Sequence, residues 1–364
     1  MSSRPLRFLG IAILATSAPF ARAEVTRDLR AQLAGVTGRE FAVENLLGTM
    51  RITAGSPDAV DVVVQATVHG ADNELASAVR LEEVRGDRGI PTLRVRYPAT
   101  RRTLRYFDPD DRRSDWPGFL FLGSLDGTRY DGRTYHVSAR RGELLYADVE
   151  VRVPPRLAGA TFVERAGRLD AEGLQGKLMF RVDSADLRLS HLRGDVDLAG
   201  SSGDTRASDI SGSWRSDFSS GDCVVSRLEG ASATFKTSSG DVQVRSIVAD
   251  RVSVETSSGD YSFRDADFQE IQTESSSGDL VIESRGNRLA RVRVETSSGD
   301  VVLTLPGDAA FRAEADQSSG DMRVGFADGQ PGYRREELVS YRRGTGGADI
   351  RVSTSSGDFT IVPR

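Results

Sequence analysis

Aspartates recur at a near-constant spacing in the C-terminal half of the chain, and they are the residues best suited to chemistry. Each closes the tetrapeptide Ser-Ser-Gly-Asp, which occurs eight times, at Asp204, Asp222, Asp241, Asp260, Asp279, Asp300, Asp321 and Asp358. A second, mostly acidic set lies five residues earlier, at Asp217, Glu255, Glu274, Glu295 and Asp316. Carboxylates stacked about 5 Å apart repel one another unless cations or hydrogen bonds compensate them.

Two roles are open for these aspartates. Oxygen ligands in a row could bind calcium, for which the candidates are Asp241, Asp260, Asp279 and Asp300. Alternatively, each carboxylate accepts hydrogen bonds from backbone N–H groups of its turn. The nine-residue glycine-rich pattern of calcium-binding β-rolls is absent from the sequence. We therefore favour turn capping and expect no cofactor, with Ca²⁺ as the one candidate.

Other catalytic constellations are missing from the sequence. His69, His136 and His191 are far apart and have neither cysteines nor a metal-type spacing beside them. No Gly-x-Ser-x-Gly nucleophile motif occurs. The single cysteine, Cys223, takes a position that is apolar in most repeats, which favours a buried thiol. We expect that the protein is not an enzyme.

The glycines of the tetrapeptide define the repeat. Their successive spacings are 18, 19, 19, 19, 21, 21 and 37, and the last gap suggests a repeat that has lost its signature. Glycine allows the positive φ that such a turn needs. The structural turn residues are Gly203, Gly221, Gly240, Gly259, Gly278, Gly299, Gly320 and Gly357.

Apolar residues alternate with polar ones on both sides of each turn, as in Val252/Val254 before Gly259 and Tyr261/Phe263 after it. This period of two indicates two half-buried strands in each repeat. A third apolar point follows each aspartate by about six residues, at Leu192, Ile210, Leu228 and Ile247. We predict an all-β fold, a single-stranded parallel β-helix (β-solenoid) of right-handed sense with about ten coils of 18–21 residues.

The rest of the chain divides into three segments. Residues 1–23 have the basic start, apolar run and small-residue cleavage site of a signal peptide. Residues 24–100 alternate like strands, with a short helix expected from Asn73 to Val84, and should begin or cap the solenoid. Residues 101–147 form an insertion loop rich in arginine and aromatic residues, either a binding loop or an end cap, and 148–364 are the solenoid.

The charge and the export signal limit the partners and the location. A net charge of −5 argues against nucleic acid as a partner. One cysteine permits no internal disulfide, which suits a bacterial envelope protein. No segment after the signal peptide is apolar enough to span a membrane. We expect an exported protein of the periplasm or the cell surface, or a secreted one.

The sequence resembles a known family. The Ser-Ser-Gly-Asp repeats, the preceding Val-Glu-Val-Arg-Val-Pro-Pro of residues 149–155, and the segment 41–52 are similar to those of the DUF4097 proteins, also called putative adhesins. The resemblance covers roughly residues 39–363. It implies a β-strand repeat architecture and an adhesin-like role, and the family has no catalytic residues to transfer.

These observations predict an exported, non-catalytic binding or scaffold module of the cell envelope, whose partner is a protein or a glycan. One alternative is an envelope-stress sensor that acts through a regulatory partner. The other is a polysaccharide-active β-helix enzyme, in which the acidic ladder holds a cation and an arginine acts as base. Only the interruptions at 101–147 and 327–347 could supply its cleft.

Overall fold

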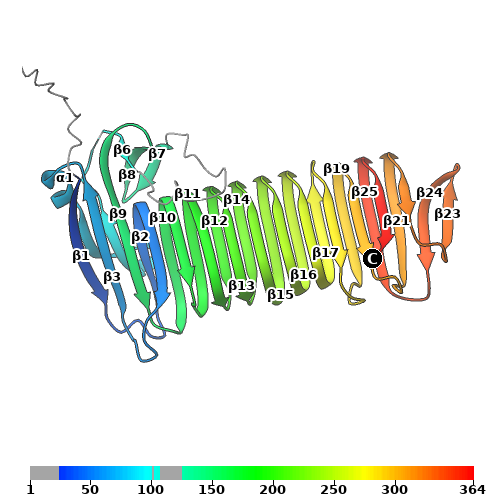
Figure 1. Cartoon of the computed structure of the whole chain (residues 1–364), viewed down its shortest axis with the longest axis horizontal. Helices are drawn as coiled ribbons and strands as arrows, with labels where there is room; N and C mark the ends of the chain where they lie inside the picture. The colour runs from blue at the N-terminus through cyan, green and yellow to red at the C-terminus, as the bar shows by residue number, and fades with distance from the viewer. Residues whose placement is uncertain (1–23, 101, 107–124) are drawn as a thin grey trace, which may run out of the picture.

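The computed structural model describes residues 24–100, 102–106 and 125–364, which form an elongated all-β molecule (Figure 1). The predicted signal peptide lies outside the described residues, as do Trp116, Phe119 and Phe121 of the insertion. Helix is confined to α1 (Asn73–Ala78) and a 3-10 turn at Asp87–Gly89 in the described part. The expected all-β class is confirmed. No helix in these ranges has the length and hydropathy to cross a bilayer.

Strands in the C-terminal half pair in parallel with their equivalents one repeat later. Val225 lies beside Val244, which lies beside Phe263. The chain therefore advances by one strand spacing for every repeat, about 4.8 Å. The strands of this stack are β10 (Leu157–Glu172), β11 (Gly176–Arg193), β12 (Val196–Ser202), β13 (Thr205–Ser211), β14 (Trp214–Ser220), β15 (Cys223–Ser239), β16 (Val242–Ser258), β17 (Tyr261–Ser275), β18 (Leu280–Ser284), β19 (Arg291–Ser298) and β20 (Val301–Leu305).

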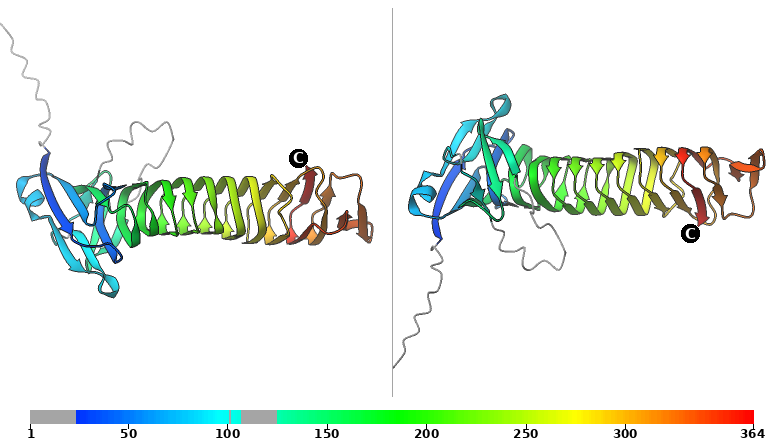
Figure 2. Two further views of the ribbon diagram at one scale, coloured as in Figure 1. Left: turned by 90° about the horizontal axis from the view of Figure 1, so that it is seen from below. Right: turned by 90° about the horizontal axis from the view of Figure 1, so that it is seen from above.

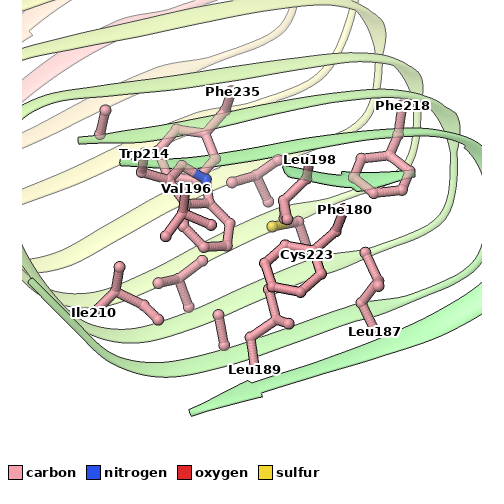
Figure 3. Packing of buried hydrophobic residues seen from close by; sticks show 14 of the residues in the cluster. Phe180, Leu187, Leu189, Val196, Leu198, Ile210, Trp214, Phe218, Cys223 and Phe235 are labelled. Carbon is pink, nitrogen blue, oxygen red and sulfur yellow. The ribbon is translucent and has the colours of Figure 1, made fainter. Parts of the chain in front are cut away.

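The core runs along the inside of the stack. The inward positions predicted from the alternation are buried, as at Val252, Val254, Tyr261 and Phe263. Figure 3 shows side chains from the strands on both sides of the turn, among them Phe180, Leu198 and Cys223, meeting in this interior. The third apolar point is buried as well, at Leu192, Ile210, Leu228 and Ile247, so each repeat packs three short stretches inward.

The stack begins earlier than residue 148. Strand β2 (Glu40–Ala54) pairs in parallel with β10, so the chain between them is an insertion after the first repeat. That insertion covers the N-terminal end with β3 (Val62–Gly70), β4 (Arg80–Arg85), β5 (Pro91–Arg96) and β9 (Glu143–Val153). β1 (Val25–Leu33) adds to β3 in antiparallel fashion. These strands spread wider than the stack (Figure 2).

The segment predicted as a loop over 101–147 contains strands. β6 (Leu104–Arg105) pairs with β8 (Arg133–Ser138) and β9, and β7 (Leu125–Tyr130) forms a hairpin with β8. Tyr130 and Tyr135 are buried and meet Tyr97 edge-on. These two aromatic side chains therefore pack within the N-terminal cap.

The helix in the cap is shorter than the sequence suggests. Asp72 caps α1 by accepting the Leu75 N–H at 2.9 Å, as expected for this residue type. The helix ends at Ala78, and β4 begins at Arg80 because residues 80–85 pair with β5.

The C-terminal end reverses the order of the repeats. β25 (Ala348–Ser356) pairs in parallel with β19 on one side and with β21 (Phe311–Ser319) on the other, and Figure 1 shows it between them. β26 (Phe359–Pro363) lies likewise between β20 and β22 (Met322–Val324). The last repeat in the sequence is thus the second last in space.

The 37-residue gap therefore does not hold a repeat that lost its signature, contrary to the expectation. It holds a hairpin of β23 (Gln330–Arg334) and β24 (Glu337–Arg343). β24 pairs in antiparallel fashion with β21 and covers part of the end of the stack. Antiparallel cover of this kind reduces the exposed edge that an open stack would leave.

Candidate functional site

The aspartate column forms an axial hydrogen-bond ladder. The backbone N–H of Asp260 donates to Oδ1 of Asp241 at 2.9 Å, and that of Asp279 donates to Oδ1 of Asp260 at 2.9 Å. The same bond joins neighbouring repeats along the stack, including Asp300 to Asp358 and Asp358 to Asp321. Each of these carboxylates therefore caps the turn of the next repeat rather than its own turn, whereas Asp321, in the last repeat in space, accepts from Arg323.

The ladder bears directly on the calcium candidates. In Asp241, Asp260, Asp279 and Asp300, Oδ1 accepts a backbone N–H from the neighbouring repeat. Within the described ranges, no group of three or more His, Cys, Asp or Glu side chains is arranged to hold a metal ion. This geometry gives each aspartate a structural role.

The second acidic set lies on the outer face of the strands before the turn. Glu255, Glu274 and Glu295 are direct neighbours in the parallel register and are exposed. Lys236 lies one repeat before Glu255 and pairs with it at 2.9 Å. Ion pairs between successive repeats recur elsewhere on the surface, for example between Arg165 and Asp183 at 2.8 Å.

Two glycine columns allow the repeats to approach closely. A Cβ on Gly259 would lie 2.2 Å from the carbonyl oxygen of Gly240, and φ at Gly259 is +129°. At each of the predicted turn glycines, a Cβ would likewise lie close to the backbone carbonyl oxygen of the residue stacked against it. A second column was not predicted from the sequence. It consists of Gly176, Gly194, Gly212 and Gly230, where a Cβ would lie 2.0–2.3 Å from a carbonyl oxygen. Its constant spacing of 18 residues was the available signal.

A shallow groove runs along the outer face of the strands that follow the turn, across five repeats. It has a volume of about 500 Å³. In parallel register, Arg51, Asp170, Arg188, Arg206 and Val224 occupy the second position after the turn. Two residues further along each strand lie Thr53, Glu172, Ser190, Ser208 and Ser226. The small side chains of the threonine and the three serines leave the hollow. We call this the arginine groove.

A second hollow of about 620 Å³ adjoins it at the next corner of the repeat. The corner residues His191, Asp209 and Arg227 have φ of 54–58°, so this column bends the chain in the left-handed region without glycine. Asp209 lies between two basic side chains, because Arg227 is bonded to it through two nitrogens and Nε2 of His191 lies 3.7 Å from its carboxylate. The hydrogen bond from Arg227 and its charge lower the pKa of Asp209.

Three arginines and two carboxylates line the arginine groove. Its acidic residues have basic neighbours: Asp170 lies 3.4 Å from Nε of Arg168, and Glu172 lies 4.0 Å from Nδ1 of His191. Arg51 and Arg188 are exposed and form no ion pair or hydrogen bond with the residues that the structure describes. The groove therefore offers guanidinium groups to a ligand.

The three histidines and the cysteine lie in different parts of the molecule. His69 in β3 contacts Glu24 and Asp148 and stacks on Tyr146, with 4.4 Å between ring centroids. His136 lies in β8, and His191 lies in the second hollow. Cys223 is buried, and burial raises the pKa of its thiol to about 12, so it is a small core side chain rather than a nucleophile.

These features define an all-β repeat protein whose repeats stack in parallel and are held by columns of identical residues. The chain belongs to the DUF4097 family: the family model, described as Toastrack DUF4097, matches residues 176–362. This confirms the resemblance seen in the repeats. No curated protein matches the chain.

Several solved structures are similar to this chain. A putative adhesin from Parabacteroides distasonis ATCC 8503 is 11% identical, with 93% of this chain and 98% of that chain covered and a TM-score of 0.42. A putative lipid binding protein from the same organism is 13% identical, with 93% and 96% covered and a TM-score of 0.34. A putative adhesin from Bacteroides fragilis NCTC 9343 is 11% identical, with 94% and 98% covered and a TM-score of 0.32.

Proposed function

We propose that this protein is an exported, non-catalytic binding or scaffold module of the bacterial cell envelope, in the manner of an adhesin. The observation that carries the proposal is the arginine groove, an open polar surface that extends across five stacked repeats. Equivalent positions of successive repeats line it, so it offers similar contacts at regular intervals. Repeat stacks commonly use such extended surfaces for binding.

The architecture that we propose for this role is a single-stranded parallel β-solenoid of right-handed sense. The parallel register from repeat to repeat and the two glycine columns support it. A solenoid with close axial contacts is stiff, and stiffness keeps the spacing of outward residues constant. Constant spacing lowers the ordering cost of binding an extended partner.

The absence of catalysis is part of the same proposal. General acid–base chemistry needs titratable groups placed within hydrogen-bond reach of a bound reactant. In the groove, Glu172 and Asp170 lie against basic side chains, and the remaining polar groups are arginines and hydroxyls. This arrangement favours holding a ligand over transforming it.

The location that we propose is the periplasm or the cell surface, on the strength of the signal peptide predicted from the sequence. The test combines purified protein of residues 24–364 on glycan and protein arrays with a deletion strain in a cell-attachment assay. We expect selective array binding, an attachment defect, and no turnover of the bound ligand. Silent arrays together with normal attachment would refute the binding role, and turnover would refute its non-catalytic character.

A further inference from the structure

We infer that the arginine groove binds an extended anionic glycan, whose acidic groups lie along the axis of the stack. This inference rests on the proposed binding function and names the class of ligand. Three outward arginines carry it: Arg51, Arg188 and Arg206, all at the second position after the turn. Guanidinium groups bind carboxylates and sulfates through strong, charge-assisted hydrogen bonds.

The spacing of the arginines suits a linear polyanion. Arg188 and Arg206 are neighbours in the register, one strand spacing apart, and Arg51 lies two spacings from Arg188 across Asp170. At about 4.8 Å for each spacing, the three guanidinium groups follow a line of roughly 14 Å. A compact anion could contact one or two of them, whereas an extended chain can contact all three.

The floor of the groove favours a sugar. Ser190, Ser208 and Ser226 lie beside the arginines and present hydroxyl groups at successive repeats. Hydroxyls both donate and accept hydrogen bonds, which matches the hydroxyls of a glycan. Beyond Ser226 the same column continues as Arg245, a much larger side chain, where the hollow ends.

The groove does not favour nucleic acid or neutral glycans. Single-stranded nucleic acids are held by bases stacked on aromatic side chains. Neither hollow is lined by tryptophan, tyrosine or phenylalanine among the described residues, so stacking platforms are lacking. Local guanidinium contacts to a flexible acidic glycan remain favourable.

The experiment measures binding of fluorescent oligogalacturonate and of a sulfated glycosaminoglycan fragment to protein of residues 24–364. Neutral dextran oligomers and single-stranded DNA are the comparison ligands. The groove variant carries Arg51→Ser, Arg188→Ser and Arg206→Ser. The matched control carries Arg181→Ser, Arg215→Ser and Arg351→Ser, which removes the same charge from exposed positions before the turn. Circular dichroism and melting curves check that both variants fold.

We expect binding of at least one acidic oligomer, weakened by added salt and reduced about tenfold or more in the groove variant. The control should retain most of the affinity. Equal losses in the two variants would overturn the inference, as would equal affinity for dextran or DNA. If the acidic oligomers fail but arrays show another partner, the glycan inference falls while the proposed binding function stands.

Discussion

The backbone N–H of Asp260 donates to Oδ1 of Asp241 across 2.9 Å, although the two residues belong to different repeats. The side chain of one repeat thus satisfies a backbone donor of the next. Together with the glycine columns, this bond couples neighbouring turns without adding bulk between them. The stability of the stack should therefore depend on individual aspartate oxygens and on glycines, which have no Cβ.

Removing one acceptor from the ladder should destabilise the stack. Asp260→Ala leaves the Asp279 N–H without its acceptor, so we expect a loss of about 1–3 kcal/mol in the free energy of unfolding. Asp260→Asn keeps an oxygen at the same place and should cost less. Urea titrations of the two variants and the wild type measure the difference.

The same titrations, repeated with calcium and with EDTA, separate the two roles of the column. Turn capping predicts no shift of the midpoint on adding either reagent. A midpoint lowered by EDTA and restored by Ca²⁺ would show that the carboxylates hold cations. Equal effects of the Ala and Asn variants would show that the axial hydrogen bond contributes little.

Alanine substitutions at four glycines should distinguish the stability cost of steric contact from that of backbone strain. Gly259 has positive φ and a Cβ contact of 2.2 Å, and Gly230 has a contact of 2.0 Å without a positive φ. Gly173 has φ of +69° with open space, and Gly286 has open space without a positive φ. We expect Gly286→Ala to be nearly neutral, Gly173→Ala to cost about 1–2 kcal/mol, and the other two to cost more.

Melting temperatures of the four alanine variants give this ranking directly. If Gly230→Ala were as mild as Gly286→Ala, close axial contact would not be what requires glycine in the second column. If Gly173→Ala were as harmful as Gly259→Ala, strain alone would account for the turn column.

The His69 cluster should make stability fall at alkaline pH. Burial lowers the pKa of His69, but hydrogen bonds to Asp148 and Glu24 outweigh it, and the pKa is raised above 6.5. A raised pKa contributes stability that is fully present below the unfolded value and is lost as pH rises through the folded value. Each pKa unit of difference corresponds to about 1.4 kcal/mol.

The measurement is urea unfolding of wild type and His69→Gln from mildly acidic to alkaline pH. The wild type should have the larger advantage at the acidic end, and the advantage should shrink above neutrality. Asp148, Glu24 and Tyr146 surround the ring, and the variant leaves all three in place. A constant difference across the range would contradict the assigned charge of His69.

At Glu164, in contrast to His69, a neutral substitution should stabilise the protein at alkaline pH. It is fully buried, and burial raises its pKa well above the usual value, although a hydrogen bond from Asn45 opposes this shift. For a carboxyl group with a raised folded pKa, stability is present below the unfolded value near 4.5 and is lost as pH rises towards the folded value. Glu164→Gln keeps an acceptor for Asn45 and removes this loss.

We therefore expect Glu164→Gln to melt at a higher temperature than wild type at pH 8, and at a similar temperature near pH 4. Glu164→Ala is the control, because it removes the acceptor and opens a cavity, and it should destabilise at both values. A Gln variant less stable than wild type at pH 8 would show that the buried carboxylate is compensated in the folded protein.

The sequence predicted the repeats well because alternation of apolar residues fixes which side chains face inward. Val254 and Phe263 are buried for this reason, and the turn glycines adopt the expected positive φ. The position of the last repeat could not be predicted, since a gap of 37 residues matches two periods as well as it matches a hairpin. Only the pairing of β25 with both β19 and β21 decides it.

The arginine groove could not be predicted from the sequence either. Arg51 and Arg188 are 137 positions apart, and the insertion after β2 hides their equivalence. Their common row appears only when β2 and β11 are both paired with β10. The outward residues follow no alternation of their own, because exposed positions are free to vary wherever packing does not constrain them.

Binding affinity as a function of glycan length tests the central claim most directly. The groove spans five repeats, or about 19 Å at the spacing of parallel strands. An acidic oligomer series, from disaccharide upwards, should bind more tightly with each added unit until it fills this length, and the gain should then level off. Affinity that does not change with length, or no binding at any length, would contradict a stack that holds an extended anionic chain along its axis.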